Sequence, residues 1–590
     1  MEKGGSGLSG VAGDSVASRE DQSHTASQTI RIRGVSAVPF LTPRLPEISE
    51  SSLIQSETAS SRFDDVGVPL NRQPEQLPVA QEQLLVNAKD IYAGLVALES
   101  KCIITRHDAV LAPSAGSKVQ AKQWQALISL HETLLGEYLD FFLAIHDPLV
   151  GRAMRQLVSK YAMPARVWRH GIHSLLELMR QHLSDSLEYL LGYLNFAFGM
   201  VALFYETIPA LKDTWAECLG DLARYRMALR VREDVYSGIW RGIARYWYRR
   251  ALSKSPKTGR LYHHLAIVSS RNSVQQLFYF IKSLRVPNPF PGATQGTTRP
   301  FAFPSGAGQA VSRAASIEDC FVTIQGIIWF GGPRQRLQDY MECFLASLSD
   351  YINLRPDCWL ATGHFIGAAL TCALLQPKAR EDLQAGAGSC PGIAQTTVNS
   401  ADSPYTMPEE MVSQSLNFTM RVFQAVLYQC ANFDTLSFLH TILAFLAYAA
   451  QSPAAMSYIG GATPWHLVVT MMNHLIICIE VVEGDYEVTH QFPAHPPARP
   501  LPEDFVMRGL PYAEGYFPSG WFESMAVDEE EKSLELPWMV MIRAKRILWV
   551  GCKIAVSGDW ILWNDITRRF SVSRNYQKDS SVPRRFSSYE

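Results

Sequence analysis

The sequence lacks several features that would mark a secreted or membrane-bound protein. Its ten cysteines are spread singly, mostly within apolar segments, and none forms a CxxC pair. Such a pattern is typical of reduced thiols in cytosolic or nuclear proteins. The N-terminal MEKGGSGLSG has no apolar stretch behind a basic start, so no secretory signal is expected. We therefore expect a protein of the nucleus, the cytoplasm or both.

Long uninterrupted apolar runs are also missing. Three shorter runs are candidates for membrane spans, namely 189–205, 359–375 and 435–450. Each falls at or below the length that crosses a bilayer, and Asn195, His364 or His440 interrupts it. We expect buried helices there and no membrane partner.

A strong global charge is absent as well. Lys plus Arg number 54 and Asp plus Glu number 56, which leaves a formal net charge of −2. No overall field therefore attracts nucleic acid or membrane, and an electrostatic partner must bind a local patch. At 47% hydrophobic residues, the chain can bury a large core.

Alternation of β-branched and polar residues is scarce, whereas apolar residues recur at helical spacing. The pattern begins after Gln81 with Leu84, Leu85, Ala88 and Ile91. We therefore predict an all-α fold with paired helices in series. The tail 1–77, rich in Ser, Gly, Glu and Gln, is predicted to be disordered.

Proline and glycine are dense after residue 287, which predicts a linker over 287–315. The remaining predicted parts are a helical domain over 78–286, a helical-hairpin domain over 316–570 and a disordered basic tail over 571–590.

One local charge asymmetry stands out. Eleven basic residues lie between Arg224 and Arg260, against only two acidic ones. On a helix predicted over 237–252, Arg241, Arg245 and Arg249 share one stripe. This stripe is either an ordinary solvated face or a binding surface for RNA or single-stranded DNA. Trp240, Tyr246 and Trp247 could stack on bases if exposed, although most of these aromatic residues are expected in the core.

A second basic face is predicted over 166–181. It carries Arg166, Arg169, His173, Glu177 and Arg180. Two such faces on neighbouring helices would form a concave phosphate site, since arginine forks make charge-assisted, bidentate bonds.

Several strings resemble proteins of the Est-one/SMG type, which includes telomerase-recruiting Est proteins and nonsense-mediated mRNA decay factors. They are WAECLGDLARYRMAL at 215–229, ARYWYRRALSKSPKTGRLYHHLAIV at 244–268, QQLFYFIKSLRVPNPF at 275–290, KYAMPARVWRHGIHSLLELMR at 160–180, LPEDFVMRGL at 501–510 and RILWVGCKIA at 546–555. The resemblance covers about 80–570. It implies a 14-3-3-like bundle fused to tetratricopeptide-like hairpins, and a non-catalytic adaptor with a phosphorylated partner.

The resemblance also implies specific phosphate ligands. Arg224 and Tyr225 match the family's GDxxRY string, and Arg180 matches a basic residue of another helix. The family's lysine position is occupied by His173, with Arg169 one turn earlier as a possible substitute. The alternative for Arg224 is a structural ion pair with Asp221 or Glu217. RNA, the telomerase ribonucleoprotein and a homo- or hetero-dimer are further possible partners.

An enzyme is the third alternative, because some relatives carry a C-terminal PIN nuclease domain. Few residues follow Leu510, strand and helix do not alternate there, and Asp559 and Asp565 are isolated acids. We therefore predict no nuclease activity. The histidine pairs lack Cys or acidic partners at ligand spacing, so no metal and no cofactor are predicted.

Overall fold

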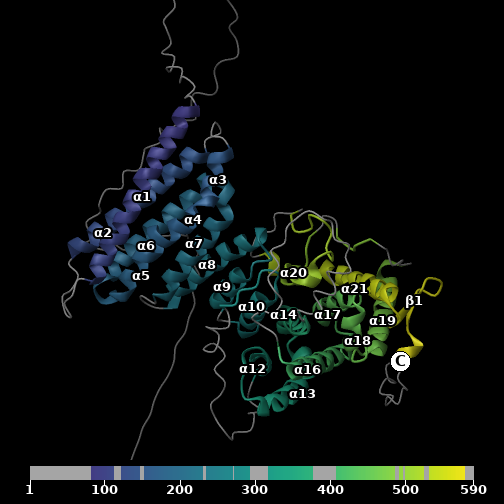
Figure 1. Cartoon of the computed structure of the whole chain (residues 1–590). Helices are drawn as coiled ribbons and strands as arrows, with labels where there is room; N and C mark the ends of the chain where they lie inside the picture. Colours follow the sequence, from purple (N-terminus) through teal and green to yellow (C-terminus); the bar gives the residue numbers. More distant parts are fainter. Residues whose placement is uncertain are drawn as a thin grey trace, which may run out of the picture. The chain divides into compact units, whose positions relative to one another are not determined.

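The computed structural model describes residues 81–111, 121–146, 152–229, 234–269, 272–292, 316–375, 407–484, 491–495, 499–523 and 531–577. The predicted tail 1–77 lies outside this part. Nearly all described segments are helices (Figure 1). The all-α class predicted from the sequence is therefore confirmed.

The first helical region runs from Gln81 to Arg285. Its elements are α1 (Gln81–Leu111), α2 (Ala121–His146), α3 (Arg152–Lys160), α4 (Met163–Arg166), the π-helix η2 (Val167–His173), α5 (Ser174–Gln181), α6 (Leu183–Thr207), η3 (Pro209–Leu211), α7 (Lys212–Ala228), α8 (Asp234–Lys254), α9 (Gly259–Val268) and α10 (Ser273–Arg285). Consecutive long helices pack as pairs, including α1 with α2, α6 with α7 and α7 with α8.

Gly220 sets the distance between α7 and α8. A Cβ atom at this position would lie 2.6 Å from the Tyr248 ring, so only glycine allows the ring to lie against α7. This close approach places the Tyr248 hydroxyl beside the polar face of α7, where Asp221 and Arg224 lie.

The second helical region contains α12 (Ile317–Phe330), η4 (Arg334–Arg336), α13 (Leu337–Leu354), α14 (Pro356–Leu374), α16 (Glu409–Leu427), η6 (Phe433–Thr435), α17 (Leu436–Ala449), α18 (Pro453–Ile459), α19 (Trp465–Glu483), α20 (Pro502–Met507), η7 (Pro511–Ala513), η8 (Glu531–Ser533), α21 (Pro537–Ser557) and η9 (Arg574–Tyr576). Helix α17 packs between α14 and α21, and α10 packs on α12 and α14. Most buried apolar residues of both helical regions form one continuous cluster, and Leu501, Met539 and Ile542 form a small second one. The domain boundary in the linker 287–315 stays a prediction, because 293–315 are not described.

A short hairpin corrects the expected start of the C-terminal tail. Strands β1 (Ile561–Asn564) and β2 (Arg569–Val572) pair antiparallel. Phe570 is buried, and the Asn473 side chain on α19 bonds both its backbone N–H (2.8 Å) and its C=O (2.9 Å). Residues 571–577, expected to be disordered, therefore belong to ordered structure because α19 supplies backbone partners that local composition does not reveal.

Helices α6 and α19 are long and apolar enough, by length and composition, to cross a membrane. Both also pack against other helices, α6 on α5 and α7 and α19 on α16 and α21. Core helices of this kind pass the same length and composition test.

Candidate phosphate-binding site

The segment 163–181 positions one wall of the site. Helices α4 and α5 are joined by the π-helix η2, whose wider turn shifts the helical register. Arg166 consequently leaves the predicted basic face. Its guanidinium bonds the buried Glu99 carboxylate on α1 (Nε to Oε2, 3.1 Å) and the Tyr92 hydroxyl (3.2 Å). Arg166 is thus a structural residue, and the face predicted over 166–181 is shorter than expected.

A hollow of about 540 Å³ lies between this segment and α7. Its polar lining comes from η2, α5 and α7, and its apolar lining from Trp168, Leu183, Ala228 and Leu229. The polar residues are His173, Glu177, Arg180, Asp221, Arg224 and Tyr225. Four of the five predicted phosphate ligands thus meet in one hollow. Arg169, the fifth, is exposed and is not part of its lining.

Glu177 connects two of these ligands. It accepts a bond from Arg180 Nη2 at 2.7 Å and one from the Tyr225 hydroxyl at 2.5 Å. The hydrogen bond from Arg180 is the main cause that lowers the pKa of Glu177; burial opposes it, and the Tyr225 bond adds to the lowering. A carboxylate of the protein itself therefore occupies the donors that a phosphate would need. The spacing of three residues between Glu177 and Arg180 is the sequence signal for this pair.

Arg224 is held on the opposite wall. Its Nη2 lies 3.0 Å from Asp221 Oδ1, and its Nε donates to the Tyr248 hydroxyl at 3.1 Å. Tyr248 in turn donates to Asp221 at 2.7 Å. The alternative for Arg224, an ion pair with Asp221, is thus present, whereas Glu217 pairs with Arg260 at 2.6 Å. The Arg224 side chain remains 28% exposed and lines the hollow.

His173 completes the lining as an aromatic neighbour. Its ring lies 6.0 Å from the Tyr225 ring in an edge arrangement and 6.0 Å from the Trp168 ring. The imidazole therefore lies beside the Tyr225 ring, at the position where the resemblance places a lysine.

The stripe proposed for nucleic acid lies on α8. Arg241, Arg245 and Arg249 are all half-buried, and Arg249 lines a different cavity. Two of the neighbouring aromatics are engaged in packing: Trp240 meets Phe198 edge-on, and Trp247 meets Tyr205. Tyr246 also meets Trp247 edge-on, although it is 44% exposed. Nucleic-acid binding stays a prediction.

A cluster of potential metal ligands, which the sequence spacing does not predict, joins α7 and α9. Potential ligand atoms of Glu217, Asp221 and His264 lie within 4.8 Å of one another. Burial lowers the pKa of His264 to about 4, so its imidazole is neutral near pH 7. Arg260 and Arg224 already pair with the two carboxylates. Since these guanidinium groups would repel a cation, the cluster serves as an internal ion-pair network, and the absence of a metal site stays a prediction.

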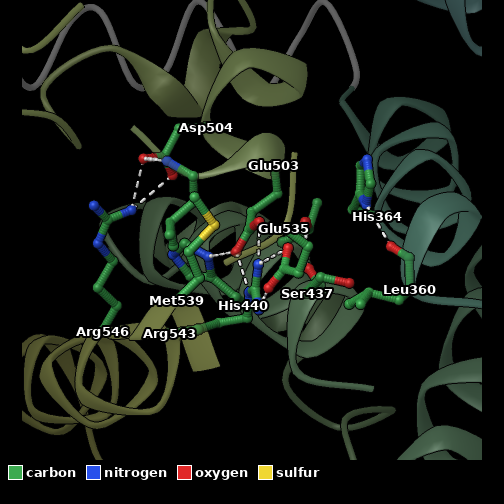
Figure 2. A network of polar contacts seen from close by, with 12 residues as sticks. Leu360, His364, Ser437, His440, Glu503, Asp504, Glu535, Met539, Arg543 and Arg546 are labelled. Carbon is green, nitrogen blue, oxygen red and sulfur yellow. Dashed lines mark hydrogen bonds and ion pairs between the residues drawn. The ribbon is translucent and has the colours of Figure 1, made fainter. Parts of the chain in front are cut away.

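The strings at 501–510 and 546–555 contribute to a buried network (Figure 2). Glu503 accepts bonds from Arg543 Nε (2.6 Å) and His440 Nδ1 (2.9 Å). Asp504 accepts from Arg546 Nη1 at 2.7 Å. The side chains of all five residues are fully buried. These strings therefore hold α20 onto α21, a structural role that sequence reasoning did not assign.

Comparisons with known proteins agree with the resemblance. No protein-family model matches the sequence. The chain is 23% identical over 175 residues to EST/SMG-like protein 2 of Saccharomyces cerevisiae, which is 28% of this chain and 14% of that protein. It is 35% identical over 74 residues to Telomerase-binding protein EST1A of Danio rerio, which is 12% of this chain and 4% of that protein. These matches cover only a small part of each relative.

The fold also resembles a solved structure. A chain of the crystal structure of Est1 and Cdc13 aligns with a TM-score of 0.52 and 11% identity, over 81% of this chain and 99% of that chain. At this identity the likeness concerns the fold. Together with the sequence matches, it confirms the resemblance to Est/SMG-type proteins.

Proposed function

We propose that this Est/SMG-type chain is a non-catalytic adaptor that binds a phosphorylated protein partner and acts in nonsense-mediated mRNA decay or telomere maintenance. The names of the two relatives, one EST/SMG-like and one telomerase-binding, support the field of action. A role in either process implies a location in the nucleus, the cytoplasm or both.

The convergence of Arg180, Arg224 and Tyr225 from two helices on one open hollow carries the phosphate assignment. Arginine and tyrosine donate hydrogen bonds to phosphate oxygens, and bonds of this type gain strength from the charge of both partners. The donors of Arg180 and Tyr225 already hold a carboxylate. A phosphate carries more charge than a carboxylate and has three acceptor oxygens, so it can compete for the same donors.

The ion pairs in the hollow decide how easily a ligand enters. The Arg180 side chain is 57% exposed and that of Glu177 is 28% exposed. Exposed ion pairs contribute only about 0–1 kcal/mol. Rotation of Glu177 out of the hollow is therefore inexpensive and would free Arg180 and Tyr225 for the phosphate.

Fluorescence anisotropy with labelled phosphoserine peptides of degenerate flanking sequence, and with their unphosphorylated twins, tests the proposal. We expect binding of the phosphorylated set alone, and losses of about tenfold to a hundredfold for Arg180→Ala and Arg224→Ala. Arg334→Ala is the matched control, because Arg334 is a comparably exposed ion-paired arginine of η4. Equal binding of both peptide sets would contradict the proposal.

The same assay separates the nucleic-acid alternative. Labelled single-stranded RNA that binds with a steep salt dependence, retained in the Arg180 and Arg224 variants but lost on changing Arg241, Arg245 and Arg249, would favour that function instead. Nucleic acid releases many counterions on binding, whereas a single phosphopeptide releases few.

A further inference from the structure

A second cavity, of about 480 Å³, lies where α8, α9 and α10 meet α14 and α20. Its walls are largely apolar and include Leu252, Leu265, Tyr279, Phe365 and Val506. It shares no lining residue with the phosphate hollow, so a ligand in this cavity would bind independently of the proposed function.

Lys282 lines this cavity although it is only 1% exposed. Its ammonium donates to the backbone oxygen of Val506 at 2.6 Å and lies 4.3 Å from the centre of the Tyr262 ring. No carboxylate in the described part of the chain pairs with it. Burial lowers the pKa of Lys282 to about 7, with a smaller contribution from Arg508. Near pH 7 this buried amine is therefore only partly protonated, and a carboxylate brought to this wall of the cavity would favour its charged form.

Further cations surround the cavity. Arg249, Arg508 and Lys532 line it, against the two acids Asp357 and Glu535. Glu535 is already bonded to Arg543, at 2.8 Å to Nη1. Arg508 donates to the backbone oxygen of Ser253 at 2.9 Å. The lining therefore has more positive than negative charge, in addition to its apolar walls.

We propose that this cavity is a docking site for an acidic peptide segment of a protein partner, which inserts an apolar side chain against Leu252, Tyr279 and Phe365. A carboxylate of the same segment pairs with Lys282 and Arg508. The apolar walls exclude water from that pair, and a desolvated charge pair with hydrogen-bonding partners discriminates strongly against uncharged analogues. A peptide fits better than nucleic acid, because the cavity surrounds its cations with apolar surface rather than presenting an open basic track.

The test uses the full chain and two pools of labelled octapeptides. One pool mixes Asp and Glu with Leu and Phe, and the other replaces every acid by its amide. We expect the acidic pool to bind about tenfold more tightly or better, since a charged acceptor strengthens each hydrogen bond that it receives from a cation. Absence of any binder in the acidic pool, or equal binding of the two pools, would overturn the proposal.

Three variants locate the binding. Ala361→Trp fills the cavity from α14, and Lys282→Met removes the charge while keeping the side-chain length. Each should weaken acidic-pool binding about tenfold or more. Leu354→Trp on α13, at a site 79% exposed and outside the cavity, should leave it unchanged. Unchanged affinity of a folded Ala361→Trp protein overturns the proposal even if Lys282→Met does not fold. Displacement of bound peptides by single-stranded RNA would assign the cavity to nucleic acid instead.

Discussion

The phosphate hollow and the buried network of α20 and α21 contain the same kind of ion pair in different roles. Both pair arginines with carboxylates, within one helix in the hollow and between α20 and α21 in the buried network. In the hollow the Arg180 and Arg224 side chains are 57% and 28% exposed, whereas those of Arg543 and Arg546 are 0% exposed. Burial, rather than residue type, separates a pair that a ligand can replace from one that holds the fold.

The physical basis of this difference is solvation. An exposed pair exchanges its partner for water or ligand at little cost. A fully buried pair has no such replacement, so removal of one member leaves an uncompensated charge in a low-dielectric interior. Substitutions in the two sites should therefore differ in how much stability they remove. The largest loss is expected in the buried network.

Arg543→Met should lower the free energy of unfolding by about 3–5 kcal/mol, because Glu503 would keep its buried charge without a guanidinium partner. Urea denaturation measures this loss. Arg421→Met is the matched control, since Arg421 forms an exposed pair with Glu342 and should cost at most about 1 kcal/mol. Equal losses in the two variants would remove the distinction between buried and exposed pairs.

The dependence of stability on pH tests the same buried network. Burial alone would raise the pKa of Glu503, but the charge of Arg543 and the bonds from His440 and Arg543 hold it well below its ordinary value. A depressed pKa contributes stability that is present above the unfolded-state pKa of about 4.3 and is lost as pH falls below it. The stability gap between the natural chain and Glu503→Gln should therefore shrink from about pH 4 downward in urea titrations. A gap that stays constant to about pH 3 would contradict this coupling.

Substitutions of Arg224 test the phosphate hollow. Arg224→Ala should weaken phosphopeptide binding about tenfold to a hundredfold, and Arg224→Glu should weaken it further. Because Arg224 also bonds Asp221 and Tyr248, both changes should lower the melting temperature, whereas Arg180→Ala should spare it. Affinity and melting temperature measured on the same proteins separate the two roles. Unchanged affinity with a lowered melting temperature would leave Arg224 as an ion-pair residue only.

Local sequence patterns predict which residues line the hollow, but not how buried a charge pair is or which distant residue completes it. The GDLARY string at 220–225 identified Arg224 and Tyr225 as residues of the hollow, and helical spacing placed Arg180 with His173. The same spacing misplaces Arg166, because the π-helix η2 changes the register, and the single glycine in its sequence VWRHGIH does not by itself predict a π-helix.

Contacts between residues far apart in the sequence leave no local pattern from which they could be predicted. The spacing within 501–510 contains nothing that identifies Arg543 as the partner of Glu503, forty positions away on another helix. The hairpin at 561–572 was likewise missed, since Asn473 stabilises it from α19. Burial and tertiary partners, which decide whether a charge pair is exchangeable, arise only from packing.

Glu177→Gln should have a smaller effect, on phosphopeptide affinity, and tests whether the exposed pair in the hollow is exchangeable. The amide keeps the shape but no longer competes as a charged acceptor for Arg180 and Tyr225. We expect phosphopeptide affinity to rise about twofold to fivefold, in line with an exposed pair of less than about 1 kcal/mol. Glu188→Gln, an exposed glutamate of α6, should change nothing. A fall in affinity would instead mean that Glu177 orients the two donors for the ligand.

The smallest effect concerns His173. The resemblance places a lysine at this position, and a lysine would add a fixed positive charge beside the phosphate. His173→Lys should therefore bind the phosphopeptide about twofold to fivefold more tightly than the natural chain, as measured by fluorescence anisotropy. His466→Lys, at an exposed position on α19, provides the control for the added charge. If the natural chain and His173→Lys bind the phosphopeptide equally, His173 only packs against Tyr225 and Trp168, and the hollow must bind phosphate through Arg180, Arg224 and Tyr225 alone.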